Sequence, residues 1–165
     1  MNRYWARTIA PEKDNYYYAQ GNIFHQYGYG MPNCTAYAWG RFFEICGTRP
    51  NLSTRDAERW YDYDDGYSRG QTPKLGAVIC WRKGSATSGD DGSGHVAIVE
   101  EISPDGTINT SNSAYGGSYF YMKSFKPPYT LRGYTFQGFI YNPIDFQKIP
   151  LWLLFKFNDW RLKRC

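Results

Sequence analysis

The chain has 165 residues, a formal net charge of +4, and an aromatic content of 19% that includes 16 Tyr. This length suits one domain with a sizeable core, and the aromatic content excludes a disordered chain. The charge favours acidic surfaces but is far below that of a nucleic-acid-binding protein, so we expect no nucleic-acid partner.

The cysteines carry no metal-binding pattern. Cys34, Cys46, Cys80 and Cys165 are widely spaced, with neither a CxxC pair nor a Cys/His spacing typical of zinc. We therefore expect no metal and no other cofactor.

The first residues, MNRYWARTIAPEKDN, lack the apolar segment of a secretory signal, which predicts synthesis in a reducing compartment without disulfides. No apolar run reaches the roughly 18 residues of a membrane-spanning helix.

Two helices are expected in the first half of the chain. The stretch 34–46 has apolar residues at helical spacing, with Asn33 suited to the N-cap and Gly47 suited to the C-terminal stop. A second, short helix is expected at 54–61, where Ser53 is suited to the N-cap.

The second half of the chain has the pattern of strands. Five β-rich stretches follow in order: 76–81, 95–102, 107–112, 117–124 and 133–142. Asp-Gly between the second and third is a hairpin signal. Helices followed by strands indicate an α+β fold, with N-terminal helices packed on a five- to six-stranded antiparallel sheet.

The last segment differs from the rest. We expect a domain over 1–142 and a separate tail over 143–165, whose IPLWLLFKFNDWRLKRC has an apolar start and a basic end. One interpretation is a last strand or helix that packs on the domain. The other is a cationic amphipathic segment that contacts a membrane.

Cys34 is the candidate nucleophile. At the first turn of a helix it lies in the positive end of the macrodipole, which is expected to lower the pKa of its thiol. A nucleophilic cysteine also needs a base, and the chain has two histidines. His95 begins a β-run after the polar SGDDGSG, where it can face the helix across a cleft, whereas His25 is interpreted as a loop histidine.

Asn112 is the candidate group that orients the base. If 102 and 107 close the hairpin, paired residue numbers sum to about 209, so Asn112 lies opposite Ala97 and one diagonal step from His95. Its amide oxygen can accept the imidazole N–H. The alternative is a turn residue that caps the strand.

These residues resemble those of the CHAP domain, a papain-like cysteine amidase or peptidase of phage and bacterial cell-wall hydrolases. The resemblance covers about 28–142. It is carried by NCTAYAWGRFFEICG around the nucleophile, DAERWY, PKLGAVICW and SGHVAIVEEISPDGTINTSNSAYGG. Two positions depart from the common pattern: Asn33 replaces Gln, and Asn112 replaces Glu. The acidic calcium loop of some relatives is absent from YAQGNIFHQYGYG, so no calcium is expected there.

The resemblance implies a peptidoglycan hydrolase with Cys34, His95 and Asn112 as catalytic residues. The Cys34 backbone N–H and the Asn33 side chain are the expected oxyanion donors. Four aromatic residues are expected to bind substrate: Tyr29, Tyr37, Trp60 and Tyr115.

Several questions stay open at this level. The bond cut is either N-acetylmuramoyl-L-alanine or one within the stem peptide or cross-bridge. We expect an endolysin-type monomer, made in the host cytoplasm and acting at the wall after lysis, with no membrane contact through the tail. The alternatives are a non-catalytic wall-binding module and a membrane-active protein driven by its tail.

Overall fold

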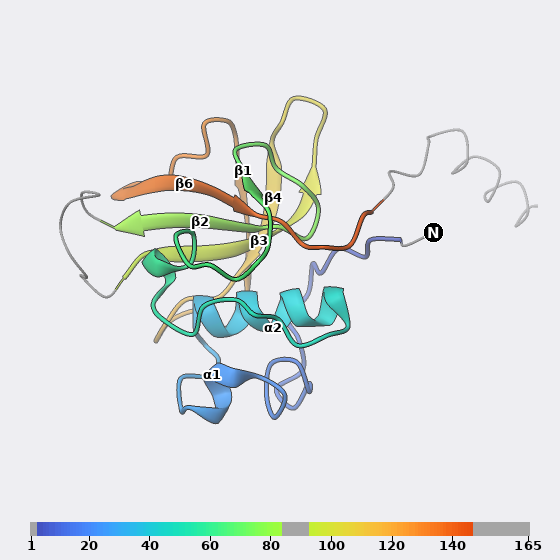
Figure 1. Ribbon diagram of the computed structural model, residues 1–165, viewed down its shortest axis with the longest axis vertical. Helices are drawn as coiled ribbons and strands as arrows, with labels where there is room; N and C mark the ends of the chain where they lie inside the picture. The colour runs from blue at the N-terminus through green and yellow to red at the C-terminus, as the bar shows by residue number, and fades with distance from the viewer. Residues whose placement is uncertain (1–2, 84–92, 147–165) are drawn as a thin grey trace, which may run out of the picture.

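An antiparallel sheet and one three-turn helix form the framework of the computed structural model, which describes residues 3–83 and 93–146 (Figure 1). The elements are α1 (Ile23–Gln26), α2 (Cys34–Cys46), the 3₁₀ helix η1 (Ala57–Arg59), β1 (Arg69–Gly70), β2 (Val78–Lys83), β3 (His95–Ile102), β4 (Ile108–Asn112), β5 (Tyr121–Phe125) and β6 (Tyr134–Ile140). The α+β class is confirmed. No helix within these two ranges is long and apolar enough to cross a membrane.

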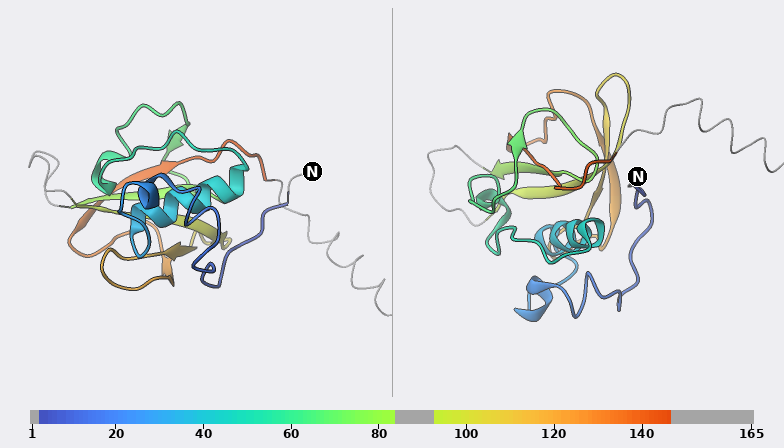
Figure 2. Two further views of the ribbon diagram at one scale, coloured as in Figure 1. Left: turned by 90° about the horizontal axis from the view of Figure 1, so that it is seen from below. Right: turned by 45° about the vertical axis from the view of Figure 1, so that its right-hand side comes forward.

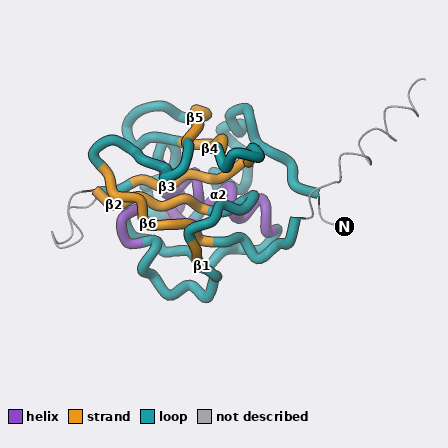
Figure 3. The backbone as a smooth tube through the Cα atoms, turned by 90° about the horizontal axis from the view of Figure 1, so that it is seen from above, coloured by secondary structure: helices purple, strands orange, loops and turns teal. Residues whose placement is uncertain are grey.

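Both faces of the sheet are buried at its centre. The strand order is β1-β6-β2-β3-β4-β5, and every pairing in it is antiparallel. Because side chains alternate along a strand, one set packs toward α2 and the other lines a second core: Val78, Cys80, Val96 and Ile98 in the first, Ala77, Ile79, Ala97 and Val99 in the second. Figure 3 shows α2 lying across the sheet behind β2, β3 and β6.

Helix α2 has the predicted bounds, 34–46, because both of its ends are set by local chemistry. The Asn33 side chain accepts the Thr35 backbone N–H at 3.2 Å, which satisfies one of the unpaired donors of the first turn. Gly47 ends the helix with φ +70, a conformation that favours glycine. The caps therefore place Cys34 at the first position of the helix.

The second predicted helix, 54–61, is wrong in length and type. Only Ala57–Arg59 is helical, as a 3₁₀ turn. Ser53 Oγ accepts the Arg55 N–H at 3.1 Å and so closes a local turn instead of capping a helix. Asp56 has an extended backbone with ψ 153, which delays the helix until Ala57.

The predicted hairpin between β3 and β4 forms with a different closure. Ile102 pairs with Ile108 and not with residue 107, and a bulge then shifts the register between Val99 and Glu101. Beyond the bulge Ile98 pairs with Ser111, a sum of 209, as predicted for this end of the hairpin. Strand β1 was not predicted, β5 begins only at Tyr121, and the tail from residue 147 onward lies outside the described residues.

A buried ion pair joins this bulge to α2. Hydrogen bonds join it to the N-terminal segment, which is drawn in dark blue in Figure 2. Glu100, the extra residue of the bulge, accepts two hydrogen bonds from Arg41 of α2, at 2.9 and 3.0 Å. It also accepts the hydroxyls of Tyr4 and Ser111 and the Arg7 backbone N–H. The Glu100 carboxylate therefore holds α2, β4 and the N-terminal segment together by hydrogen bonds.

Candidate active site

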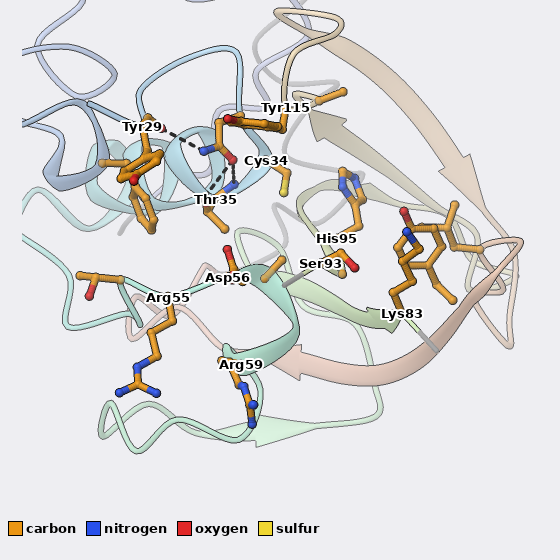
Figure 4. A pocket seen from close by; sticks show the side chains of 18 of the residues that line it. Tyr29, Cys34, Thr35, Arg55, Asp56, Arg59, Lys83, Ser93, His95 and Tyr115 are labelled. Carbon is orange, nitrogen blue, oxygen red and sulfur yellow. Dashed lines mark hydrogen bonds between the residues drawn. The ribbon is translucent and has the colours of Figure 1, made fainter. Parts of the chain in front are cut away.

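Cys34 and His95 line the same pocket, a cavity of about 920 Å³ between the start of α2, η1 and the edge of the sheet. Figure 4 shows the two side chains next to each other, Cys34 from the helix and His95 from the strand. Cys34 is nearly buried, and its sulfur accepts a hydrogen bond from the Val96 backbone N–H of β3. The helix start and the strand start are thus directly in contact.

A close crossing of the backbone fixes where His95 begins its strand. Gly94, just before it, has φ +107, and a Cβ there would lie 2.6 Å from the Glu58 nitrogen of η1. The Glu58 N–H donates to Ser93 O at 2.9 Å at this crossing. A glycine is therefore required before the histidine. Trp81, the β2 partner of His95, stacks on its ring with centroids 5.8 Å apart.

Asn112 holds the imidazole in one tautomer. Its Nδ2 donates to the carbonyl and hydroxyl oxygens of Thr110, each at 3.0 Å, so its Oδ1 is left to face His95. The distance from Oδ1 to His95 Nε2 is 3.0 Å. Because an amide oxygen only accepts, Nε2 carries the proton and Nδ1 carries the lone pair. The free lone pair makes Nδ1 the basic nitrogen of the pair with Cys34.

Ser113 ties the strand of Asn112 to the start of α2. Its hydroxyl accepts the Asn33 backbone N–H at 3.1 Å and donates to Ser118 O at 3.2 Å. One buried hydroxyl thus connects the residue before Cys34 with the residue after Asn112. Neither Ser113 nor Trp81 was predicted from the sequence, because their contacts join segments far apart in the chain.

The expected low pKa of the Cys34 thiol is wrong for the free protein. Burial raises its pKa to about 11, although backbone N–H groups, that of Val96 foremost, act in the opposite direction. Burial also lowers the pKa of His95, with the Asn112 hydrogen bond opposing this and the Lys123 charge adding to it. Both shifts favour the uncharged form, so the resting pair is a neutral thiol and a neutral imidazole.

The predicted oxyanion donors lie at the helix start. The Cys34 backbone N–H belongs to the first turn, whose N–H groups have no acceptor within the helix. The Asn33 side chain has other partners: Oδ1 accepts from Thr35, and Nδ2 donates to Tyr29 O at 2.9 Å, as the dashed lines in Figure 4 show. One amide hydrogen of Asn33 is left for an oxyanion.

Two of the four predicted substrate-binding residues are wrong. Tyr37 and Trp60 are fully buried among the core side chains between α2 and the sheet, so neither reaches the pocket. Tyr29 and Tyr115 do line it, and they are 60% and 77% exposed. The difference arises because helical spacing identifies an apolar face without showing whether a sheet covers it.

Charge around the pocket is mostly positive. Among the described lining residues Asp56 is the one carboxylate, whereas four are basic: Arg55, Arg59, Lys83 and Lys123. Within residues 3–83 and 93–146, no three His, Cys, Asp or Glu side chains gather in an arrangement that could hold a metal ion.

A model of the CHAP domain family matches residues 24–114 of the 165. The chain belongs to the CHAP family. This CHAP domain is 32% identical over 110 residues to the "Probable autolysin LDP" of Staphylococcus aureus, over 65% of the chain and 36% of that protein.

A solved structure agrees with the fold. The N-acetylmuramoyl-L-alanine amidase from Staphylococcus aureus superposes with a TM-score of 0.50 at 26% identity, over 66% of this chain and 32% of the amidase. The chain therefore matches about a third of the length of each relative. The CHAP resemblance is confirmed, and the roles of Cys34, His95 and Asn112 stay predictions.

Proposed function

We propose that this CHAP domain hydrolyses an amide bond of bacterial peptidoglycan by cysteine nucleophilic catalysis. One observation carries the proposal: His95 is held by Asn112 at 3.0 Å and lies beside Cys34 at the start of a helix. Nucleophile, base and orienting group are the set that such catalysis needs. Family membership and the names of the autolysin and amidase relatives support the substrate class.

Because the Cys34 thiol and the His95 imidazole are both neutral at rest, a proton must move between them in the first step of the reaction. As the Cys34 sulfur attacks the carbonyl carbon, its proton passes to His95 Nδ1, so the buried thiolate forms only while it is consumed. The Cys34 backbone N–H, with the remaining Asn33 amide hydrogen, stabilises the oxyanion. His95 then gives the proton to the leaving nitrogen, the C–N bond breaks, and a thioester remains. Water attacks the thioester with His95 as base, the C–S bond breaks, and the acid and the thiol are released.

The exposed aromatic residues provide a surface for the substrate. Tyr29 and Tyr115 both line the pocket, and Figure 4 shows Tyr115 next to Cys34. Flat aromatic side chains with a polar end pack well against sugar rings and peptide backbone. We therefore assign substrate contact to these two tyrosines.

The finer identity of the enzyme stays a prediction. An N-acetylmuramoyl-L-alanine amidase and an endopeptidase of the stem or cross-bridge use the same chemistry. The endolysin type, the cytoplasmic origin, the monomeric state and the packing of the tail are likewise predictions.

The test is digestion of purified peptidoglycan by wild type, Cys34→Ala and Cys46→Ala, followed by mass spectrometry of the fragments. Cys46 lies at the opposite end of α2, so its variant controls for the loss of a thiol from the same helix. We expect fragments from wild type and Cys46→Ala only. A new L-Ala amine identifies an amidase, and any other new amine identifies an endopeptidase. Release by Cys34→Ala would overturn the proposal, and binding to the wall without any release would favour the non-catalytic module.

A further inference from the structure

A carboxylate enters the pocket next to the candidate nucleophile. Asp56 directly precedes η1, and Figure 4 shows its side chain pointing from the η1 side toward the start of α2, where Thr35 and Cys34 lie, whereas His95 approaches from the sheet. Its backbone carbonyl accepts the Arg59 N–H at 2.9 Å, but its side chain makes no capping hydrogen bond. Within the described part of the chain, the Asp56 carboxylate has no hydrogen bond or ion pair.

Neither folding nor the attack step explains this carboxylate. It is exposed and contributes no hydrogen bond, so it adds little to stability. Its negative charge raises the pKa of the Cys34 thiol and therefore opposes formation of the thiolate. A charge that opposes activation in the free protein requires another reason to lie in this position.

We propose that Asp56 binds a primary ammonium group of the substrate next to the scissile amide bond. This inference rests on the proposed function and specifies its substrate: the peptide part of peptidoglycan, not the sugar chain. The ammonium has two sources there, the side chain of the diamino acid in the stem and the free terminus of a cross-bridge.

The rest of the pocket suits such a peptide. Stem peptides carry carboxylates as well as amines, and the lining offers basic residues to those carboxylates: Arg55 and Arg59 near Asp56, Lys83 on β2 and Lys123 on β5. The Asp56 carboxylate is the one negative charge among the described lining residues, so an ammonium group that enters the pocket has this one carboxylate to pair with. Once an ammonium pairs with Asp56, the carboxylate no longer opposes ionisation of Cys34, so recognition of the substrate also favours the attack.

The test compares wild type and Asp56→Asn on purified peptidoglycan, either untreated or with its free amines acetylated. Acetylation removes the ammonium charge from the wall and leaves the amide bonds in place. Asp64→Asn is the matched control, because Asp64 is also exposed but does not line the pocket. Initial rates of fragment release are measured, and fragment masses show whether a diamino acid or a cross-bridge terminus adjoins the cut.

We expect acetylation to slow wild type and Asp64→Asn by roughly tenfold or more, the usual effect of losing a hydrogen bond to a charged group. Asp56→Asn should be slowed by a similar factor on untreated wall and should be insensitive to acetylation. If wild type ignores acetylation, or if Asp56→Asn behaves as Asp64→Asn does, this inference is overturned while the proposed function stands. If wild type releases nothing from untreated wall, the proposed function fails and the inference fails with it.

Discussion

Replacing the buried Glu100 by Gln tests how much its hydrogen bonds and ion pair stabilise the β3–β4 hairpin, which carries Asn112. The Glu100 side chain is fully buried and accepts five hydrogen bonds, two of them from Arg41, whose side chain is 6% exposed. Each carboxylate oxygen faces at least two donors. The amide nitrogen of Gln would therefore meet donors whichever way it turned, and part of the buried Arg41 charge would lose its partner.

The magnitude follows from the burial of this pair. Breaking a buried ion pair by removing one partner costs about 3–5 kcal/mol of unfolding free energy. For a chain of this size that corresponds to a fall in Tm of roughly 6–20 °C. The measurement is urea unfolding of wild type and Glu100→Gln, with the midpoint and the m value fitted together so that a change in cooperativity is visible.

Glu101→Gln is the matched control. Glu101 is the next residue of β3, but it is exposed and accepts one hydrogen bond, from Asn109 at 3.0 Å. Its substitution should cost no more than about 1 kcal/mol. If the two variants lose the same stability, or if Glu100→Gln loses less than Glu101→Gln, the argument from the buried network is refuted.

Three further predictions concern the site itself. Asn112→Ala should lower kcat by about 100-fold or more, because His95 loses the group that orients it, and steady-state kinetics that showed no change would remove Asn112 from the site. Because the pKa of the Cys34 thiol is raised to about 11, its rate of alkylation by iodoacetamide should rise about tenfold per pH unit from 7 to 10. Peptide mapping measures the rate at this one thiol. A rate that is already constant near pH 7 would indicate a preformed ion pair of Cys34 and His95 instead. Gly94→Ala should lower the unfolding free energy by more than about 2 kcal/mol, because the new Cβ would collide with backbone atoms at a residue with φ +107. Gly116→Ala should cost only about 1 kcal/mol, because Gly116 has φ +64 and open space around it. Equal Tm values for the two variants would contradict this prediction.

Local chemistry explains why some features were predictable from the sequence. The bounds of α2 depend on Asn33 and Gly47, which act within a few residues of where they stand. The Gly-His start of β3 is equally local in sequence, although its cause, the crossing of η1 against Gly94, is not. Features that a short stretch determines by itself were therefore predicted correctly.

The position of Asn112 was predicted through two errors that cancel. The hairpin closes at Ile102 and Ile108, one residue later than expected, and the bulge at Glu100 moves the register back by one. The bulge is stabilised by Arg41 and by the N-terminal segment, neither of which is near it in sequence. Such contacts leave no local pattern to detect.

Burial explains the remaining failures. The position of Cys34 at a helix start favours a low pKa, but the strand that packs over the thiol raises it. Tyr37 and Trp60 are aromatic residues of the kind that lines a groove, yet both are covered by other elements. Asp56 was passed over as part of a helix that does not form there.

The most direct test of the central claim is whether turnover passes through a thioester on Cys34. Peptidoglycan is digested in the presence of neutral hydroxylamine, which attacks a thioester and releases the acyl group as a hydroxamate. We predict hydroxamate-terminated fragments with wild type and none with Cys34→Ala. Hydrolysis by wild type that yields free acids alone, at a hydroxylamine concentration that captures a model thioester, would contradict nucleophilic catalysis by Cys34.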